Sequence, residues 1–357
     1  MCYNGIMKKV ITMIGAIFVY VILGLTVVVP LAVTQGIMDI YFKKRVTRSS
    51  YAKTELDYEG LVKEPKYFSN GIRKLGGGLF HNENVKEYRG VIIVSHGIGC
   101  SLYSYIQVID YFTRKGWLVF GFDMSGCDSS EGSGMVGLQQ AVIDLKHAIK
   151  YVRELPETQG LKLCVFGHSW SGYASAAVLN DSYAAKTVDA VASTSGFNKF
   201  WDIVLEQCEK VVGDAVKLAK PAAYACSYFK FGKYANYTGI GGVNNFKKPI
   251  LIAQSKDDPT VQWEDSIAYR QNECTNPKAE FLIYDDLKHS LHRPKWAEDK
   301  INESCVGKKF MEKGNMNNFQ YLMERRYQFV SSEVTLALNE EYMDKLEDFF
   351  ERAIKEA

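Results

Sequence analysis

The chain has 357 residues, of which 47% are hydrophobic and 24% charged, and this excludes a disordered tail or a small disulfide-stapled scaffold. The length fits one large domain or a domain with insertions. The 43 basic and 41 acidic residues give a formal net charge of +2, which provides no basic surface for a nucleic-acid partner. The eight cysteines are widely spaced without a C-x-x-C pair, so zinc-ligand spacing is absent. We interpret most of them as free buried side chains, although their even number permits disulfides.

The N-terminal segment differs in composition from the rest of the chain. Residues 10–38 contain no charged residue, and this run exceeds the roughly 20 residues that a helix needs to span a bilayer. It is longer than the apolar region of a signal peptide and lacks a good cleavage site. We therefore predict a single-pass membrane anchor over residues 1–40, followed by a polar tether over residues 41–65. Basic residues flank both ends of the run, so the side of the membrane on which the catalytic domain lies stays open.

Beyond the tether, short apolar runs alternate with helical patterns. The runs predict strands over residues 66–72, 75–81, 90–95, 117–122, 161–166, 188–193, 249–253 and 280–284. Helical spacing predicts helices over residues 103–115, 138–155, 171–180 and 339–355. This alternation indicates an α/β fold with a mainly parallel sheet flanked by helices, whose core we place at residues 66–196 and 247–357. The connections 197–246 and 292–332 are too long for structureless loops, and we predict that residues 197–246 form a helical cap or lid.

One serine lies at the junction of a predicted strand and a predicted helix. Residues 167–172 read Gly-His-Ser-Trp-Ser-Gly and directly follow the strand at 161–166. A nucleophilic serine needs a sharp strand-to-helix turn, which small residues two positions before and after it permit. The motif therefore predicts Ser169 as the nucleophile, the alternative being a tight turn with a hydrogen-bonded serine. Ser171 and Ser175 lie inside the following helix and are poorer candidates.

A serine nucleophile needs a base, and the base needs a carboxylate that orients it. Only His289 and His292 follow Ser169 in the chain, and His289 comes five residues after a predicted strand. We predict His289 as the base and His292 as a surface or supporting histidine. The acid should follow the preceding strand, where Asp258 stands three residues before an apolar residue that can anchor the loop. Asp258 is the preferred acid and Asp257 the alternative.

The negative charge that develops during acyl transfer needs two backbone N–H donors. The residue after the nucleophile, Trp170, is expected to supply one. The loop His-Gly-Ile-Gly at residues 96–99 follows the strand at 90–95, and we expect Ile98 to supply the other. An ordinary loop turn is the alternative. Cys100 comes directly after this loop, and we interpret it as a packing residue.

These motifs resemble the α/β-hydrolase superfamily, and within it the group of serine aminopeptidases and monoacylglycerol-lipase-like enzymes. The resemblance extends from about residue 67 to residue 357, and rests on residues 96–99, 167–172 and 123–132. The last string is similar to the group's D-x-R-G-x-G-x-S-x-G loop, but Ser125 stands in place of the usual Arg and Asp128 in place of the second Gly. Membership implies that no metal and no organic cofactor take part. It does not determine the substrate, because this fold supports many reactions.

The motifs together predict a membrane-anchored serine hydrolase that cleaves carboxylic or acylglycerol esters through a Ser-His-Asp triad. A serine aminopeptidase or amidase is the main alternative. An acyltransferase, and a catalytically inactive binding module of the same fold, are further ones. The expected partners are a small-molecule or lipid ester and the membrane. Among the aromatic residues of the predicted cap, we expect Trp201 and Phe229 to contact an apolar part of the substrate.

Overall fold

The computed structural model describes residues 52–204, 220–303 and 330–356, together with residues 45–48 and a few positions nearer the N-terminus, namely 7, 12–18, 20, 32 and 36. Among these residues, no helix combines the length and the apolar character that crossing a membrane requires. Most of residues 10–38 lie outside the described part of the chain, so the anchor stays a prediction.

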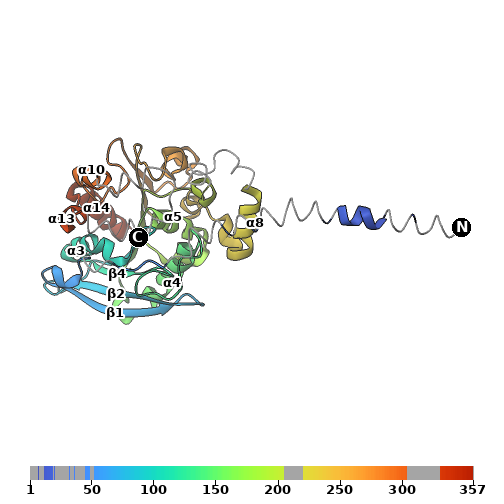
Figure 1. The fold of residues 1–357 in the computed structure, drawn as a ribbon. Coiled ribbons are helices and arrows are strands. Elements are labelled where there is room, and N and C mark those ends of the chain that lie inside the picture. Colours follow the sequence, from blue (N-terminus) through green and yellow to red (C-terminus); the bar gives the residue numbers. More distant parts are fainter. Residues whose placement is uncertain are drawn as a thin grey trace.

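The described chain forms a sheet of eight strands in the order β1-β2-β4-β3-β5-β6-β7-β8 (Figure 1). The strands are β1 (Leu61–Ser69), β2 (Lys74–Asn82), β3 (Val91–Ser95), β4 (Leu118–Phe122), β5 (Leu163–His168), β6 (Ala190–Thr194), β7 (Ile250–Ser255) and β8 (Ala279–Tyr284). β1 and β2 form an antiparallel hairpin, and β2 also pairs antiparallel with β4. All other pairs are parallel. The predicted α/β class with a mainly parallel sheet is thus confirmed.

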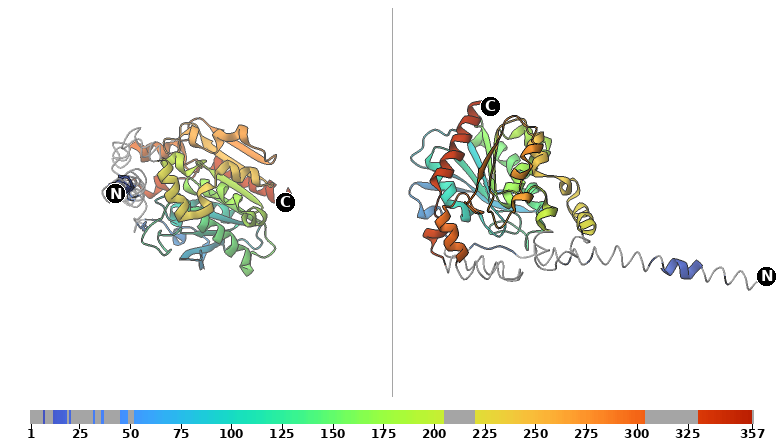
Figure 2. Two further views of the ribbon diagram at one scale, coloured as in Figure 1. Left: turned by 90° about the vertical axis from the view of Figure 1, so that its right-hand side faces the viewer. Right: turned by 90° about the horizontal axis from the view of Figure 1, so that it is seen from above.

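Helices cover both faces of the sheet. They are α3 (Ile106–Arg114), α4 (Gln140–Glu154), α5 (Trp170–Ala177), α6 (Ser182–Thr187), α8 (Lys220–Phe231), α9 (Gly239–Asn245), α10 (Lys295–Glu303), α13 (Ser332–Thr335) and α14 (Glu340–Glu356). Short 3₁₀ turns connect several of them, among them η3 (Leu102–Tyr105) and η5 (Val178–Asn180). Figure 2 shows α14 on one face of the sheet and α5 on the other.

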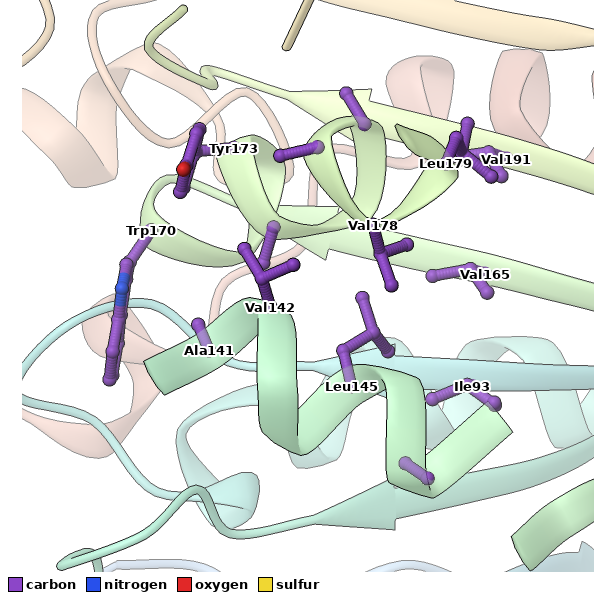
Figure 3. Packing of buried hydrophobic residues seen from close by; sticks show 14 of the residues in the cluster. Ile93, Ala141, Val142, Leu145, Val165, Trp170, Tyr173, Val178, Leu179 and Val191 are labelled. Atoms are coloured by element: carbon purple, nitrogen blue, oxygen red, sulfur yellow. The ribbon is translucent and has the colours of Figure 1, made fainter. Parts of the chain in front are cut away.

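Two apolar cores hold the helices against the sheet, because successive side chains of a strand point to opposite faces. Ile93 of β3 faces the core formed with α4 and α5, whereas its neighbour Ile92 faces the core formed with α3 and α14. Figure 3 shows side chains of α4 and α5, such as Leu145 and Trp170, in one cluster with Ile93 of β3 and Val165 of β5. The parallel strands β3, β4, β5, β6 and β7 are buried along their whole length, as expected of strands covered on both faces.

The first hairpin differs from its prediction. β1 begins at Leu61 rather than at residue 66, so it takes up part of the predicted tether. The three glycines at 76–78 lie inside β2 and do not interrupt it. A Cβ on Gly77 would lie 2.4 Å from the carbonyl oxygen of Gly121 in β4, so glycine permits the close pairing of these strands.

The segment directly after the predicted anchor is attached to the hydrolase core. Val46 forms an isolated parallel bridge with Cys127. The guanidinium group of Arg45 donates hydrogen bonds of 2.8 Å to the carbonyl oxygens of Ser130 and Gly132, and one more to that of Asp128. Residues 45–48 therefore lie against the loop at 123–132 instead of forming a free tether.

The predicted cap is divided between two parts of the structure. Helix α8 is attached to the core where Gln139 Nε2 donates a 2.8 Å hydrogen bond to Ser227 Oγ, and both residues are buried. The end of the predicted cap, α9, packs into the core itself, since Ile240 and Val243 are buried in the same cluster as α5. Residues 205–219 of the cap lie outside the described part of the chain.

Candidate active site

Ser169 lies at the tight turn between β5 and α5. Its φ of +61° and ψ of −117° are unusual for a residue with a side chain, and its N–H donates to the carbonyl oxygen of Thr194 at 2.8 Å. A Cβ on Gly167 would lie 2.1 Å from the Ser171 carbonyl oxygen, and one on Gly172 would lie 2.4 Å from that of Thr194. The glycines on either side of the serine are therefore required by the close contacts of this turn.

The structure brings Ser169, His289 and Asp258 together, although they come from separate loops. His289 Nε2 lies 2.9 Å from Ser169 Oγ, and its Nδ1 lies 2.7 Å from Asp258 Oδ2. The carboxylate of Asp258 is fully buried, whereas 15% of the His289 side chain is exposed. Serine hydroxyl, imidazole and carboxylate thus form one continuous hydrogen-bonded chain with the geometry of a nucleophile, a base and an orienting acid.

Asp258 is held rigidly by its own loop. Its Oδ1 accepts hydrogen bonds from the N–H groups of Thr260 and Val261 at 2.8 and 3.0 Å. Its Oδ2, which faces His289, also accepts from Gln254 Nε2 at 3.1 Å. Val261 is buried, as the spacing Asp-x-x-Val predicted, and it anchors this loop in the core.

Asp257, the alternative acid, has a different set of partners. Its carboxylate accepts hydrogen bonds from Ser255 Oγ at 2.6 Å and from the Lys288 N–H at 3.0 Å, and it forms an ion pair with Lys288 Nζ at 2.9 Å. Partial burial alone would raise the pKa of Asp257, but the hydrogen bonds from Ser255 and Lys288 outweigh it and lower that pKa. Asp257 thus fixes the residue before His289 rather than the imidazole.

The other serines of the motif are used in packing. Ser171 Oγ donates to the carbonyl oxygen of His96, and Ser175 Oγ donates to that of Gly172 at 3.0 Å. Both side chains are fully buried. In this structure neither hydroxyl is placed to act as a nucleophile.

The two predicted oxyanion donors belong to segments that adjoin the serine, since Trp170 follows it directly and a Cβ on Gly97, the residue before Ile98, would lie 3.4 Å from the Cβ of Ser169. Within the described part of the chain, no hydrogen bond uses the N–H of Ile98 or that of Trp170, the first residue of α5. The buried ring of His96 holds the loop that carries Ile98, because its Nδ1 bonds the Gly97 carbonyl oxygen at 2.8 Å and its Nε2 accepts from the Met124 N–H at 3.0 Å. Since C=O and N–H point in opposite directions across a trans peptide, this bond turns the Ile98 N–H away from His96.

Burial keeps His96 in the form that these two bonds need. It lowers the pKa of His96 to about 4, so the ring is neutral at physiological pH, with the proton on Nδ1 and a lone pair on Nε2. The motif at 96–99 is therefore more than a loop turn, since its histidine links the loops after β3 and β4.

In the loop at 123–132, hydrogen bonds from other residues take the place of the arginine that the family resemblance led us to expect. At Ser125, where the group has Arg, the N–H and hydroxyl donate to the buried carboxylate of Asp144 at 2.8 and 3.1 Å. Asn70 Nδ2 donates to the same carboxylate at 2.6 Å. An arginine does reach this loop, but it is Arg45, from a distant part of the sequence.

The structure corrects one expectation and adds residues that the sequence did not single out. His292 is not at the surface: it is fully buried, and its ring lies 4.7 Å from that of His168. The carbonyl oxygen of His289 accepts from Ser195 Oγ at 2.7 Å and lies 3.1 Å from His168 Nε2. His168 could have been suspected because it precedes the nucleophile, whereas no local pattern marks Ser195.

The two predicted cap residues differ in environment. Trp201 is 8% exposed and packs against the rings of Phe200 and Tyr224, at 3.6 and 5.4 Å between centroids. Phe229 on α8 is 84% exposed, so it lines no enclosed apolar pocket in this structure. Cys100 is partly buried, and Cys127, Cys164 and Cys274 are free thiols.

Among the described residues, one group of acidic side chains is close enough to hold a metal ion, Glu347, Asp348 and Glu351 of α14. Glu347 pairs with Arg89 at 2.8 Å, and none of the three is a predicted site residue.

Residues 86–230 match the sequence model of a family described as serine aminopeptidase, S33. No curated protein matches the chain. Among solved structures, the Pyrococcus furiosus esterase Pf2001 is similar over 87% of this chain and 98% of its own, with 18% identity and a TM-score of 0.55. An acylaminoacyl peptidase from Pyrococcus horikoshii is similar over 72% of this chain and 42% of its own, with 15% identity and a TM-score of 0.50. At these identities the structural matches establish the fold alone.

Proposed function

Because the chain belongs to the α/β-hydrolase superfamily, and over residues 86–230 to its serine aminopeptidase S33 family, we propose that it is a serine hydrolase of carboxylic or acylglycerol esters. The observation that carries this proposal is the hydrogen-bonded chain from Asp258 through His289 to Ser169 at a strained turn. A tight turn with an ordinary serine would not need a buried carboxylate behind the histidine.

The proposed reaction proceeds through an acyl-enzyme. Ser169 Oγ attacks the ester carbonyl carbon and passes its proton to His289 Nε2, and the Asp258 carboxylate stabilises the imidazolium. The N–H groups of Ile98 and Trp170 stabilise the oxyanion of the tetrahedral intermediate. The intermediate then expels the alcohol, which takes the proton from His289. A water molecule, deprotonated by His289, releases the acid by the same steps and frees Ser169.

An ester with an apolar acyl or alkyl group is the substrate class that the predicted cap supports. Its residue Trp201 packs with the rings of Phe200 and Tyr224, and we expect an apolar cluster of this kind to contact such a group. The similarity in fold to the Pyrococcus furiosus esterase is consistent with this substrate class.

An aminopeptidase is the second candidate, since the matching family is described as serine aminopeptidase. The triad could cleave an amide by the same steps, so the two candidates differ in the substrate they bind rather than in the catalytic groups. A panel of p-nitrophenyl esters and aminoacyl anilides separates them. Faster cleavage of any anilide than of every ester would replace the esterase proposal with the aminopeptidase one.

The experiment that tests the proposed chemistry is labelling with a fluorophosphonate, which reacts with activated serines. We expect the wild-type protein to be labelled and Ser169→Ala to be unlabelled, with turnover lower by about 10⁴-fold or more. Ser171→Ala is the matched control in the same motif, since its hydroxyl bonds a backbone carbonyl. Equal labelling of wild type and Ser169→Ala would refute the assignment.

We further propose that residues 10–38 anchor the enzyme in a membrane, on the strength of their length and lack of charge. Membrane fractionation followed by N-terminal sequencing tests this. A mature protein that begins near Gln35 would indicate a cleaved signal peptide instead.

A further inference from the structure

A buried tyrosine and a buried histidine connect the two halves of the candidate site. The N–H of Gly97, in the loop that carries Ile98, donates a 3.0 Å hydrogen bond to Tyr105 Oη. Tyr105 Oη lies 2.7 Å from His168 Nδ1. His168 Nε2 in turn lies 3.1 Å from the backbone carbonyl oxygen of His289. One chain of hydrogen bonds thus runs from the oxyanion loop to the base.

The chemistry of these groups gives the chain a single direction. Because the Tyr105 oxygen accepts from Gly97, its own proton is available to donate to His168 Nδ1. A ring that accepts at Nδ1 is neutral and carries its proton on Nε2, where it donates to the His289 carbonyl oxygen. Each group in the chain therefore has a matching partner, and this pairing assigns the tautomer of His168.

Both ends of the chain are sensitive to small displacements. A Cβ on Gly97 would lie 3.0 Å from Tyr105 Oη and 3.4 Å from the Cβ of Ser169, so this residue is tightly enclosed between them. At the other end, Ser195 Oγ also donates to the His289 carbonyl oxygen, and Lys288, the residue before His289, has a φ of +59°. The backbone that carries the imidazole is thus held from several sides.

The chain is shielded from water, which strengthens its hydrogen bonds. Tyr105 is 3% exposed and His168 is 4% exposed. The ring of His292 covers both, at 4.7 Å from the ring of His168 and 5.3 Å from that of Tyr105. His292 is thus a buried neighbour of both groups rather than a surface residue.

We propose that Tyr105 and His168 are positioning residues that couple the placement of the oxyanion donor Ile98 to the placement of the base His289. This inference rests on the proposed function, because it assigns roles to groups around the same serine. Neither residue touches the reacting atoms, so both act through Gly97 and His289. Their loss should weaken binding of the transition state and leave binding of the substrate unchanged.

Three substitutions separate the two ends of the chain. Tyr105→Phe removes the hydroxyl and keeps the ring. His168→Gln places an amide nitrogen near the position of Nε2, so it keeps the donor to His289 and loses the acceptor for Tyr105. His168→Asn places an amide oxygen near the position of Nδ1, so it keeps the acceptor and loses the donor. Tyr111→Phe on α3, the helix that directly follows Tyr105, is the matched control, because this buried tyrosine donates its hydroxyl proton to Asp344 instead.

We expect Tyr105→Phe and both His168 variants to lower kcat by about tenfold each, the factor typical of one buried hydrogen bond, with KM changed by no more than about twofold. The affinity for a trifluoromethyl ketone, which forms a hemiketal with the serine and places an oxyanion at the donors, should fall by the same factor.

The outcomes distinguish this inference from the proposed function. If wild type is neither labelled by fluorophosphonate nor active on esters, the proposed function fails. If wild type is active while Tyr105→Phe and both His168 variants keep their kcat and ketone affinity, or lose activity through KM alone, the coupling is refuted. Circular dichroism and thermal unfolding establish that each variant is folded. Should the His168 variants not fold, the near-isosteric Tyr105→Phe, compared with Tyr111→Phe, decides the question alone.

Discussion

The neighbouring carboxylates Asp258 and Asp257 provide a sharp test of the proposed triad, because the two substitutions to Asn remove the same charge one residue apart. In Asp258→Asn one orientation of the amide is favoured, because it turns the NH₂ group toward a single donor, Gln254 Nε2, whereas the opposite orientation would turn it toward two backbone N–H groups. Oδ1 of Asp258 receives the N–H groups of Thr260 and Val261, so the amide oxygen of an asparagine must remain there. The NH₂ group then faces His289 Nδ1, where the carboxylate oxygen Oδ2 was.

This orientation has a direct consequence for the base. An NH₂ group donates, so His289 Nδ1 must accept, and the imidazole proton moves to Nε2. Nε2 faces Ser169 Oγ at 2.9 Å and would present an N–H instead of the lone pair that takes the serine proton. In chymotrypsin-like triads the same substitution lowers kcat by about 10⁴-fold, and we expect a loss of that size here, which corresponds to about 5.5 kcal/mol of activation free energy.

Asp257→Asn should have a small effect. Its Oδ1 still accepts hydrogen bonds from Ser255 and the Lys288 N–H, so the variant loses mainly the ion pair with Lys288 Nζ. Both side chains of this ion pair are partly exposed. Such a pair contributes at most about 1 kcal/mol, or roughly fivefold. Steady-state kinetics of both variants with p-nitrophenyl butyrate, after circular dichroism to verify folding, measure the difference. If kcat falls more in Asp257→Asn than in Asp258→Asn, or falls equally in both, the assignment of Asp258 as the acid is wrong.

The remaining predictions concern stability, substrate and the N-terminal segment. Burial lowers the pKa of His96 to about 4 from an ordinary 6.5, so between these pH values the unfolded chain takes up a proton that the folded chain does not. The free energy of unfolding therefore falls as the pH falls through this window, by up to about 3 kcal/mol from this group. Urea unfolding at pH 7 and pH 4.5 should show that the stability advantage of wild type over His96→Asn shrinks at the lower pH; a constant difference would contradict the buried neutral ring. Across the p-nitrophenyl esters of acetate, butyrate, hexanoate and octanoate, kcat/KM should rise by about fourfold per methylene until the pocket is filled. Trp201→Ala should abolish this rise, whereas Phe229→Ala, at an exposed position, should keep it. A flat wild-type profile would count against an apolar acyl pocket. Deleting residues 1–40 should leave a soluble, active enzyme. Deleting residues 1–50 also removes the charge-assisted hydrogen bonds of Arg45, and this should lower the free energy of unfolding by about 2 kcal/mol. Equal stability of the two truncated proteins would show that this contact contributes little.

The sequence was sufficient to predict the elements and residues whose signals are local. Buried strands read as β-branched runs, and the glycine-flanked Ser169 follows one of them directly. The order of serine, acid and histidine along the chain led to Asp258 and His289, and the Asp-x-x-Val spacing favoured Asp258 over Asp257. The strand runs, the serine turn and the Asp-x-x-Val spacing depend on neighbours within a few residues, whereas the order of the three residues is a rule of the fold.

What could not be predicted depends on contacts between distant residues. Tyr105 meets His168 across 63 positions, and His168 meets His289 across 121, so no spacing along the chain identifies either contact. The close pairing of β2 with β4 decides that Gly77 lies within a strand, although glycine alone suggests an interruption. Likewise, α9 lies in the core because Ile240 and Val243 fit beside α5, a result of packing that the length of the insertion could not reveal.

The attachment of Arg45 and Val46 to the loop at 123–132 determines how far the enzyme can reach. Seven peptide steps separate residue 38 from residue 45, a span of at most about 25 Å when fully extended. If residues 10–38 cross a bilayer, this loop can never move farther than that from the membrane surface. So short a connection would keep the catalytic domain next to the membrane surface. It would then meet esters that reside in that membrane at a high effective concentration, whereas an ester dissolved in the bulk would gain nothing from the confinement.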